Sequence, residues 1–277
     1  NEEEIMSDIQ LRPEKKGNLR LNLRSRVQPF KGSNEWEEIV VQKEFPTSKT
    51  AILLCDMWDT HWCYGAAQRC EVLCIKANPI VAEARKNGVQ IIHAPSDCMD
   101  FYDDTPQRQR MIDASPAEMP EPKELPDPPL PIDDSDGGCD TEKTPGFTGW
   151  TRQHAAIKIS NYDGVSDNGQ EVYNLMQQIG IENLIIMGVH TNMCVLGRSF
   201  AIKTMTRIGI HCVLVRDLTD AMYNPEKHPY VTHDEGTEQV IQHIEKYWCP
   251  TVTSSVFTGK EEFVFDEKNR PHVVFMI

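Results

Sequence analysis

Three polar side chains in this sequence have the chemistry of a covalent hydrolase: the carboxyl of Asp56, the amine of Lys158 and the thiol of Cys194. A thiol attacks as its thiolate, and a free cysteine is mostly protonated at neutral pH. A nearby carboxylate can take the thiol proton and pass it later to a leaving amine. Because a lysine and a helix N-terminus both favour the thiolate, these residue types predict a Cys194 nucleophile with a lowered pKa.

Short apolar runs place these side chains near the ends of predicted strands. The runs are Ala51–Cys55, Ala155–Ile159 and Leu184–Met187. The first ends in Asp56, the second contains Lys158, and the third is followed by Cys194, which opens a predicted helix over residues 193–207. In open parallel sheets, ligands bind beyond the carboxyl ends of the strands, so we expect the three side chains to converge at one edge.

Strand and helix patterns alternate along most of the chain. The other predicted strands are Leu19–Val27, Glu37–Lys43, Val89–Ala94 and Ile210–Val215, and the other predicted helices are Ala66–Asn87, Gln170–Ile179 and Thr237–Trp248. This alternation predicts an α/β protein with a three-layer, Rossmann-like fold, in which helices cover both faces of a parallel sheet. No glycine-rich phosphate-binding motif follows the first strand of the main domain, which argues against a dinucleotide or ATP site.

The sequence divides into three segments. Residues 1–48 form a charged N-terminal arm that we expect to pack on the main domain or on a neighbouring subunit, and residues 49–250 form the hydrolase domain. Residues 251–277 form a C-terminal extension with two possible strands. An insertion at residues 100–150 holds seven prolines between 114 and 136, which rule out a helix or central strand there. This surface insertion could cover the mouth of the active site.

Composition limits the partners of the protein. A formal charge of −14 over 277 residues disfavours nucleic-acid binding, and no apolar run approaches the length of a membrane helix. Nine cysteines, an odd number in a chain of this size, favour free thiols and a reducing, cytoplasmic location, although a signal peptide removed before Asn1 stays open. We therefore expect Cys63, Cys70 and Cys74 to be buried thiols rather than metal ligands. Likewise, the acids around Gly137 are expected to form a solvated turn rather than a calcium loop.

Three motifs resemble those of the isochorismatase-like cysteine hydrolases, a superfamily that includes nicotinamidases and N-carbamoylsarcosine amidases. They are Ile52-Leu53-Leu54-Cys55-Asp56-Met57, Ile157-Lys158-Ile159-Ser160-Asn161-Tyr162-Asp163 and Met187-Gly188-Val189-His190-Thr191-Asn192-Met193-Cys194-Val195. The resemblance covers about residues 50–220 and is most specific in the third motif. It implies an Asp-Lys-Cys triad, a cis peptide between Val189 and His190, an oxyanion hole formed by the amides of His190 and Cys194, and a homo-oligomer.

The sequence departs from the family pattern in two places. Trp58–Trp62 replaces the usual residues after the aspartate, in a region that lines the substrate pocket of relatives. The candidate substrate-binding residues are His61, Trp62, Tyr102 and Trp150, although each aromatic ring could equally pack in the core. Met99 stands where the resemblance to nicotinamidases would require a metal-binding histidine after Asp97, so we expect no metal and no cofactor.

These observations predict a hydrolase that cleaves an amide-type C–N bond of a small molecule through a Cys194 thioester. Isochorismatase-type hydrolysis of a vinyl ether is a second enzymatic possibility. A non-catalytic binding or scaffold protein that kept the fold is a third. The presence of all three triad residue types favours an enzyme, and Cys194 favours the amidase side.

Overall fold

The computed structural model describes residues 12–13, 15–261 and 263–265. A single eight-stranded sheet runs through the molecule in the order β2-β1-β8-β7-β6-β3-β4-β5. The strands are β1 (Asn18–Val27), β2 (Glu37–Pro46), β3 (Thr50–Cys55), β4 (Gln90–Ala94), β5 (Gly164–Val165), β6 (Asn183–Val189), β7 (His211–Asp220) and β8 (Thr251–Val252). The helices are α1 (Tyr64–Lys86), α2 (Pro106–Ile112), α3 (Gly169–Gln178), α4 (Cys194–Gly197), α5 (Ile202–Arg207), α6 (His233–Tyr247) and α7 (Ser255–Thr258). Two short 3₁₀ helices cover Thr47–Lys49 and Met99–Tyr102.

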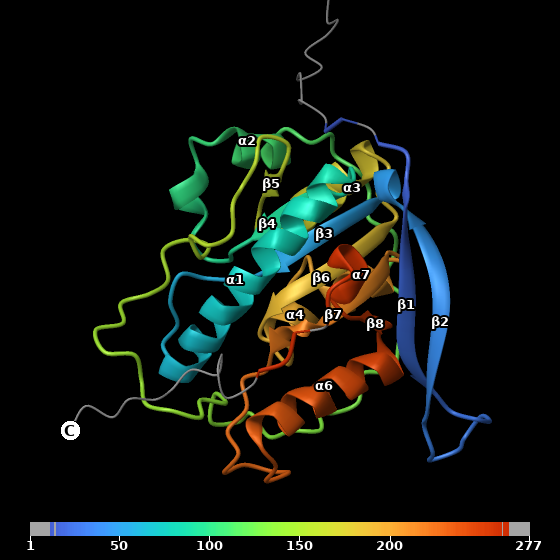
Figure 1. Cartoon of the computed structure of the whole chain (residues 1–277), viewed down its shortest axis with the longest axis vertical. Coiled ribbons are helices and arrows are strands. Elements are labelled where there is room, and N and C mark those ends of the chain that lie inside the picture. The colour runs from blue at the N-terminus through green and yellow to red at the C-terminus, as the bar shows by residue number, and fades with distance from the viewer. Residues whose placement is uncertain (1–11, 14, 262, 266–277) are drawn as a thin grey trace, which may run out of the picture.

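The central strands are parallel and are buried on both faces. β3 pairs with β4 on one side and with β6 on the other, and every residue of these three strands is buried. Alternate residues of β3 therefore enter two separate cores: Ile52 and Leu54 pack against α1, whereas Ala51 and Leu53 belong to the core on the opposite face. Helices α1 and α7 cover the first face, and α3, α5 and α6 cover the second (Figure 1). This is the predicted three-layer α/β fold.

The N-terminal arm contributes an antiparallel hairpin to the edge of the sheet. β1 pairs with β2 along its whole length and meets β8 at one point, Arg24 opposite Thr251. Three leucines of β1 are buried in the α1-side core: Leu19, Leu21 and Leu23. The arm therefore packs on the main domain and extends its sheet, rather than hanging free of it.

Two predicted elements are wrong. Residues 155–159 do not form a strand, because the chain turns there: the amide of Ile157 donates to the His154 carbonyl, and only Ile157 is buried. Residues 193–207 do not form one helix, because α4 ends at Gly197 and Arg198 is extended (φ −63°, ψ 152°) before α5 begins. Four apolar residues around a lysine suit a turn as well as a strand, which explains the first error.

The proline-rich part of the insertion, residues 114–136, forms neither helix nor strand, as its composition predicts, and α2 lies in the part of the insertion before it. The proline-rich part is a strap that lies across α3 and α5 and reaches the loop before Cys194. Along its path the amide of Ala117 donates to Asn174, Asp127 forms ion pairs with Lys203 and Arg207, and Asp134 accepts a hydrogen bond from Asn192. The strap therefore supports the Cys194 loop from the α3–α5 side.

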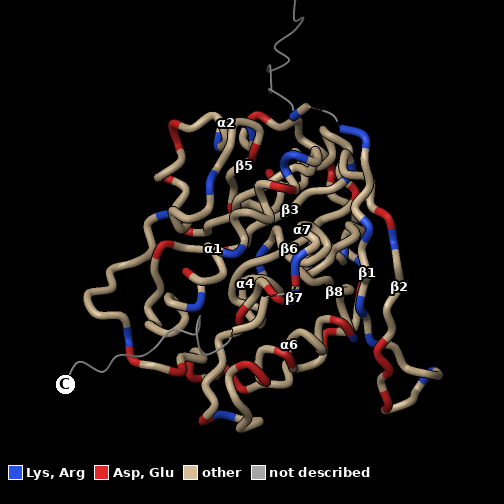
Figure 2. Tube along the Cα trace, viewed as in Figure 1, with Lys and Arg blue, Asp and Glu red and all other residues tan. Residues whose placement is uncertain are grey.

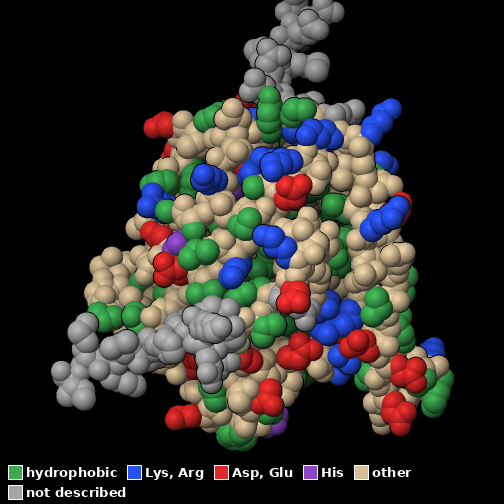
Figure 3. Space-filling model, in the orientation of Figure 1, with side chains coloured by type: hydrophobic (Ala, Val, Ile, Leu, Met, Phe, Trp, Pro, Cys, Tyr) green, Lys and Arg blue, Asp and Glu red, His purple; other side chains and the backbone are tan. Residues whose placement is uncertain are grey.

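Charged side chains of both signs are interspersed along the chain and over the face seen in Figure 3. Both signs occur on the β1–β2 hairpin, and several acidic residues lie on α6 itself (Figure 2). No helix within the described ranges is long and apolar enough to span a membrane. Of the C-terminal extension, the structure shows β8 and α7. The other possible strand of the tail falls largely outside the described residues.

Candidate active site

Asp56 lies directly after β3, with a backbone in the left-handed region (φ 49°) and a completely buried side chain. One carboxylate oxygen accepts the backbone N–H of Ser96 at 2.8 Å. The other accepts the Nε–H of Arg198 at 2.9 Å. A buried charge is tolerated where it is paired and hydrogen-bonded, and both oxygens of Asp56 meet that condition.

Cys194 begins α4 and is half-buried, and its thiol lies beside the Asp56 carboxylate, which raises the pKa of the thiol. The backbone N–H of His190 lies near the same sulfur and lowers the pKa of the thiol. The peptide bond between Val189 and His190 is cis. The structure thus brings together the predicted nucleophile, the predicted base and one of the two amides predicted to form the oxyanion hole.

Gly188 is the residue that lets the strand end approach β3 this closely. Its φ is +125°, and a Cβ placed on it would lie 2.1 Å from the carbonyl oxygen of Cys55. No side chain fits in that space without moving the backbone. The glycine therefore holds the His190 loop against the end of β3, where Asp56 follows.

Arg198 is a site residue that the sequence interpretation missed. The interruption between α4 and α5 directs its guanidinium to Asp56, and a second nitrogen contacts Asp97 at 3.2 Å. Its position four residues after Cys194 was a usable signal, because residues so spaced share one side of a helical segment. In a continuous helix over residues 193–207, Arg198 would be expected on the solvent-exposed side.

Lys158 is not brought to this site. It lies in the loop that replaces the predicted strand, its side chain is exposed, and its backbone N–H donates to Asn78 on α1. Its carbonyl accepts from Arg85 on the same helix. The positive charge beside Asp56 belongs to Arg198 instead.

The electrostatics of the site also differ from the expected ones. Burial raises the pKa of Cys194 to about 12, and the neighbouring Asp56 carboxylate adds to that rise, which Arg198 and the His190 amide only partly oppose. The expectation of a lowered Cys194 pKa is therefore wrong, since the predicted helix dipole is reduced to one turn and the cation is engaged with Asp56. Burial also raises the pKa of Asp56, against the lowering effect of Arg198. The resting site therefore holds a protonated thiol beside the carboxyl group of Asp56.

Aromatic rings lie beside the thiol. Trp58 stacks on Trp150 with centroids 3.9 Å apart, and both belong to an apolar cluster that includes Tyr102 and contacts Cys194. Tyr102 is buried, and its hydroxyl accepts the backbone N–H of Gln153 at 2.8 Å. Two of the four predicted substrate-binding residues, Tyr102 and Trp150, are thus in the cluster around the thiol, together with Trp58.

The other two predicted substrate-binding residues lie in the next layer. His61 is buried, stacks on Trp150 and meets the His190 ring edge-on with centroids 4.8 Å apart. Burial lowers the pKa of His61 to about 4, so the ring is neutral at physiological pH. Trp62 packs in a different cluster with Cys63 and Met193.

A disulfide joins Cys63 to Cys139, which corrects the expectation that Cys63 is a free thiol. It links the segment before α1 to the end of the insertion, a pairing of distant residues that sequence spacing does not reveal. Cys70 and Cys74 are buried free thiols, as expected. Within the described residues, no three His, Cys, Asp or Glu side chains are grouped so as to hold a metal ion.

A buried ionic cluster supports the other side of the His190 loop. Arg69 on α1 contacts Asp220 at 2.8 Å and Asp140 at 2.9 Å, and His233 contacts Asp220 at 2.8 Å. The carbonyl of Asp220 accepts the backbone N–H of Thr191. Asp140 therefore takes part in this cluster, and the expected solvated acidic turn is in fact tied to its neighbours.

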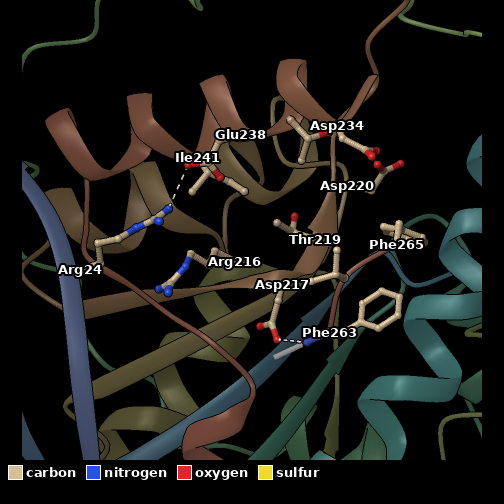
Figure 4. A pocket seen from close by; sticks show the side chains of 12 residues that line it. Arg24, Arg216, Asp217, Thr219, Asp220, Asp234, Glu238, Ile241, Phe263 and Phe265 are labelled. Atoms are coloured by element: carbon tan, nitrogen blue, oxygen red, sulfur yellow. Dashed lines mark hydrogen bonds and ion pairs between the residues drawn. The ribbon is translucent and has the colours of Figure 1, made fainter. Parts of the chain in front are cut away.

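A separate cavity of about 280 Å³ lies between β7, α6 and residues 263–265 (Figure 4). Arg24, Asp217, Asp220 and Glu238 are among its lining residues. Asp56, Cys194 and Arg198 are not. Asp217 accepts the backbone N–H of Phe263. The cavity therefore lies where residues 263–265 pack against β7 and α6, and it is separate from the thiol site.

The fold and this site define a class: an α/β protein with a cysteine and an acid at the carboxyl edge of a parallel sheet. A protein-family model, the isochorismatase domain, matches residues 50–234. The chain belongs to the isochorismatase family, and so to a superfamily of hydrolases. No curated protein sequence matches it.

Several solved structures are similar to this chain at low sequence identity. A cysteine hydrolase from Pseudomonas syringae pv. phaseolicola has 13% identity and a TM-score of 0.46, over 76% of this chain and 90% of the other. An isochorismatase-like hydrolase from Alkaliphilus metalliredigens has 14% identity and a TM-score of 0.45, over 76% and 95%. PnC1 from L. infantum, in complex with nicotinate, has 16% identity and a TM-score of 0.39, over 76% and 95%. The assignment to the family rests on the family model.

Proposed function

We propose that this protein hydrolyses an amide-type C–N bond of a small molecule through a thioester on Cys194. The observation that carries the proposal is that the Cys194 thiol lies beside the buried Asp56 carboxylate, close enough for the carboxylate to raise the pKa of the thiol, with the His190 N–H nearby. A nucleophile, a base within reach and a backbone donor are the parts that acyl transfer requires.

The reaction proceeds in two balanced halves. In the first, the thiol proton moves to Asp56 as Sγ attacks the carbonyl carbon, and the amides of His190 and Cys194 stabilise the oxyanion. Collapse of the tetrahedral intermediate breaks the C–N bond, and the proton on Asp56 moves to the leaving nitrogen. In the second, Asp56 takes a proton from water, the hydroxide attacks the thioester, and the carboxylic acid leaves as Sγ regains a proton.

Arg198 is the positioning residue for Asp56 in this mechanism. Burial favours the neutral carboxylic acid, which could not accept the thiol proton, and so raises the pKa of Asp56. The guanidinium opposes that shift and keeps the carboxylate ionised between turnovers. Arg198 thereby takes the role that the family resemblance gave to Lys158.

The surroundings of the thiol suit an uncharged substrate with an apolar or aromatic part. Trp58, Tyr102 and Trp150 supply ring surface, and His61 beyond them is neutral. The nearby cation, Arg198, already forms ion pairs with both Asp56 and Asp97. Small neutral amides and ureides are therefore the substrates to test first.

The test is ammonia release from a panel of small amides and ureides, combined with intact-mass detection of an acyl adduct. We expect turnover by the wild type, an adduct on Cys194, and loss of both in Cys194→Ala. Cys98→Ala is the matched control, because Cys98 is a buried thiol of the same cluster whose pKa is also raised to about 12. No adduct and no turnover across the panel would instead favour a vinyl-ether substrate or a non-catalytic binding protein.

A further inference from the structure

We infer that β2 is a dimerisation strand, which pairs antiparallel with β2 of a second copy across a two-fold axis and joins the two sheets. β2 ends the sheet order and pairs with β1 on one side only. Within the described part of the chain, no other strand pairs with it. This inference concerns a surface of the arm and is independent of the proposed reaction.

The free edge is long and apolar at its centre. Nine of its ten residues are exposed, and Ile39, Val40 and Val41 keep 36%, 60% and 47% of their surface accessible. Soluble proteins usually protect an edge of this length with a bulge, a proline, charged side chains or a covering element. The charged residues of β2 lie on either side of its apolar centre and do not interrupt it. In β2 the pairing with β1 runs without a register shift, and the single proline is the last residue, Pro46. Such an edge is suited to pairing with another strand.

The hairpin that presents β2 is held firmly to the body. Leu19, Leu21 and Leu23 of β1 are buried in the core, and Arg24 contacts the buried carboxylate of Glu245 on α6 at 2.6 Å. In Figure 1 the hairpin forms the outer margin of the molecule, with β2 outermost. A preformed edge loses little conformational entropy on pairing, which favours association.

The sequence of β2 is complementary to itself, which identifies the partner as a second copy of this chain. When two copies pair antiparallel about Val40, Glu37 lies opposite Lys43, Glu38 opposite Gln42 and Ile39 opposite Val41. Each of these pairs occurs twice in a two-fold dimer. Opposite charges and apolar side chains directly opposite one another stabilise an antiparallel pair.

Neighbouring registers lack this complementarity. Pairing about Val41 would place Glu38 opposite Glu44 and Ile39 opposite Lys43. Pairing about Ile39 would place Glu37 opposite Val41 and Glu38 opposite Val40. Like charges and charge-to-apolar pairs are unfavourable across a strand pair, so the Val40-centred register is selected.

The test measures mass against protein concentration by light scattering and sedimentation. For the wild type we expect a concentration-dependent rise from 31.6 kDa towards twice that mass. Glu37→Lys and Lys43→Glu should each raise the dissociation constant about tenfold or more, because two attractive pairs become repulsive. Lys86→Glu, an exposed charge reversal on α1, is the matched control and should leave the dimer unchanged.

Mixing the two single variants tests the register itself. A Glu37→Lys chain opposite a Lys43→Glu chain regains both unlike-charge pairs, so the mixture should dimerise where each variant alone does not. The doubly reversed chain should also dimerise. A monomeric wild type at all concentrations, or single variants that associate as tightly as the wild type, would overturn the inference. Circular dichroism of each variant verifies that the hairpin and the sheet remain folded.

Discussion

Replacing Arg198 by methionine is the sharpest test of the proposed site, because it separates this residue from Lys158. Methionine keeps much of the volume of the side chain and removes the guanidinium that contacts Asp56 at 2.9 Å. The Cys194 thiol and the Asp56 carboxyl group are left unchanged. The matched control is Lys158→Met, which removes the exposed lysine that the family resemblance points to.

The expected loss follows from the electrostatics of the ion pair. Two unit charges about 4 Å apart interact by about 4 kcal/mol at an effective dielectric constant of ~20. The Arg198 side chain is 30% exposed, so solvent screens part of that energy. We therefore expect the loss of this charge-assisted contact to cost about 2–3 kcal/mol. Since about 1.4 kcal/mol changes a rate tenfold, kcat/KM at neutral pH should fall roughly 100-fold.

The pH dependence gives a more specific signature than the size of the loss. Burial raises the pKa of Asp56 and Arg198 lowers it, so removing Arg198 moves this pKa further up. The base is then protonated over a wider range, and the acidic limb of kcat/KM should shift to higher pH, with partial recovery in alkali. Arg198→Lys keeps the charge and should lie between the wild type and Arg198→Met.

The assay is a pH–rate profile of the best substrate from the amide panel for the wild type and the three variants. Lys158→Met should match the wild type within about twofold, since an exposed lysine contributes little to a site it does not contact. An unshifted acidic limb in Arg198→Met would refute the reasoning. A loss in Lys158→Met as large as that in Arg198→Met would refute it equally.

Three further changes test other parts of the site. Asp56→Asn should abolish turnover yet speed iodoacetamide labelling of Cys194 at mildly alkaline pH, because the Asp56 carboxylate raises the Cys194 pKa; slower labelling than in the wild type would contradict this. Gly188→Ala should destabilise the fold by about 3 kcal/mol or more, seen in urea unfolding, because its Cβ has no room; a change below about 1 kcal/mol would count against the close approach. Asp220→Asn should cost about 3 kcal/mol at pH 7. The partners of Asp220 lower its pKa in the folded state, so the stabilisation from this carboxylate is complete above the pKa of the unfolded chain and is lost as the pH falls. The difference in unfolding free energy between the wild type and the variant should therefore become smaller in acid.

The raised pKa of Cys194 changes how the nucleophile is expected to work. A preformed thiolate would react with general alkylating agents, whereas a thiol held by a carboxylate is activated when a substrate carbonyl is in position. The half-buried thiol, the buried base and the surrounding rings fit this second mode. Slow alkylation of the wild type is therefore compatible with catalysis by Cys194.

The proline-rich strap has a clearer role in the structure than in the sequence. It crosses α3 and α5 and ends at Asp134, which holds Asn192 two residues before Cys194. Asn192 also accepts the backbone N–H of Met222, so the strap and the end of β7 meet on one side chain. The strap thus positions the loop that carries the nucleophile.

Local pattern was enough to predict most of the elements. The apolar runs before Asp56 and Gly188 form β3 and β6, because strands buried on both faces have continuous apolar sequences. The helical spacing of apolar residues over 66–87 corresponds to α1. The predicted strand at residues 155–159 is absent, since four apolar residues around Lys158 can also form a turn packed against a helix. The predicted helix after Cys194 is interrupted at Arg198, which is extended and forms ion pairs with the distant residues Asp56 and Asp97.

The sequence by itself determined the α/β class, the family and two members of the site, Asp56 and Cys194, because strand ends and short motifs are local properties. Only the tertiary structure decided which cation joins them, which cysteines pair and how the thiol titrates. Those outcomes depend on distances between residues far apart in the chain: 142 positions separate Arg198 from Asp56, and 76 separate Cys63 from Cys139. Burial set by the whole fold, rather than residue type, fixes the charge states at this site.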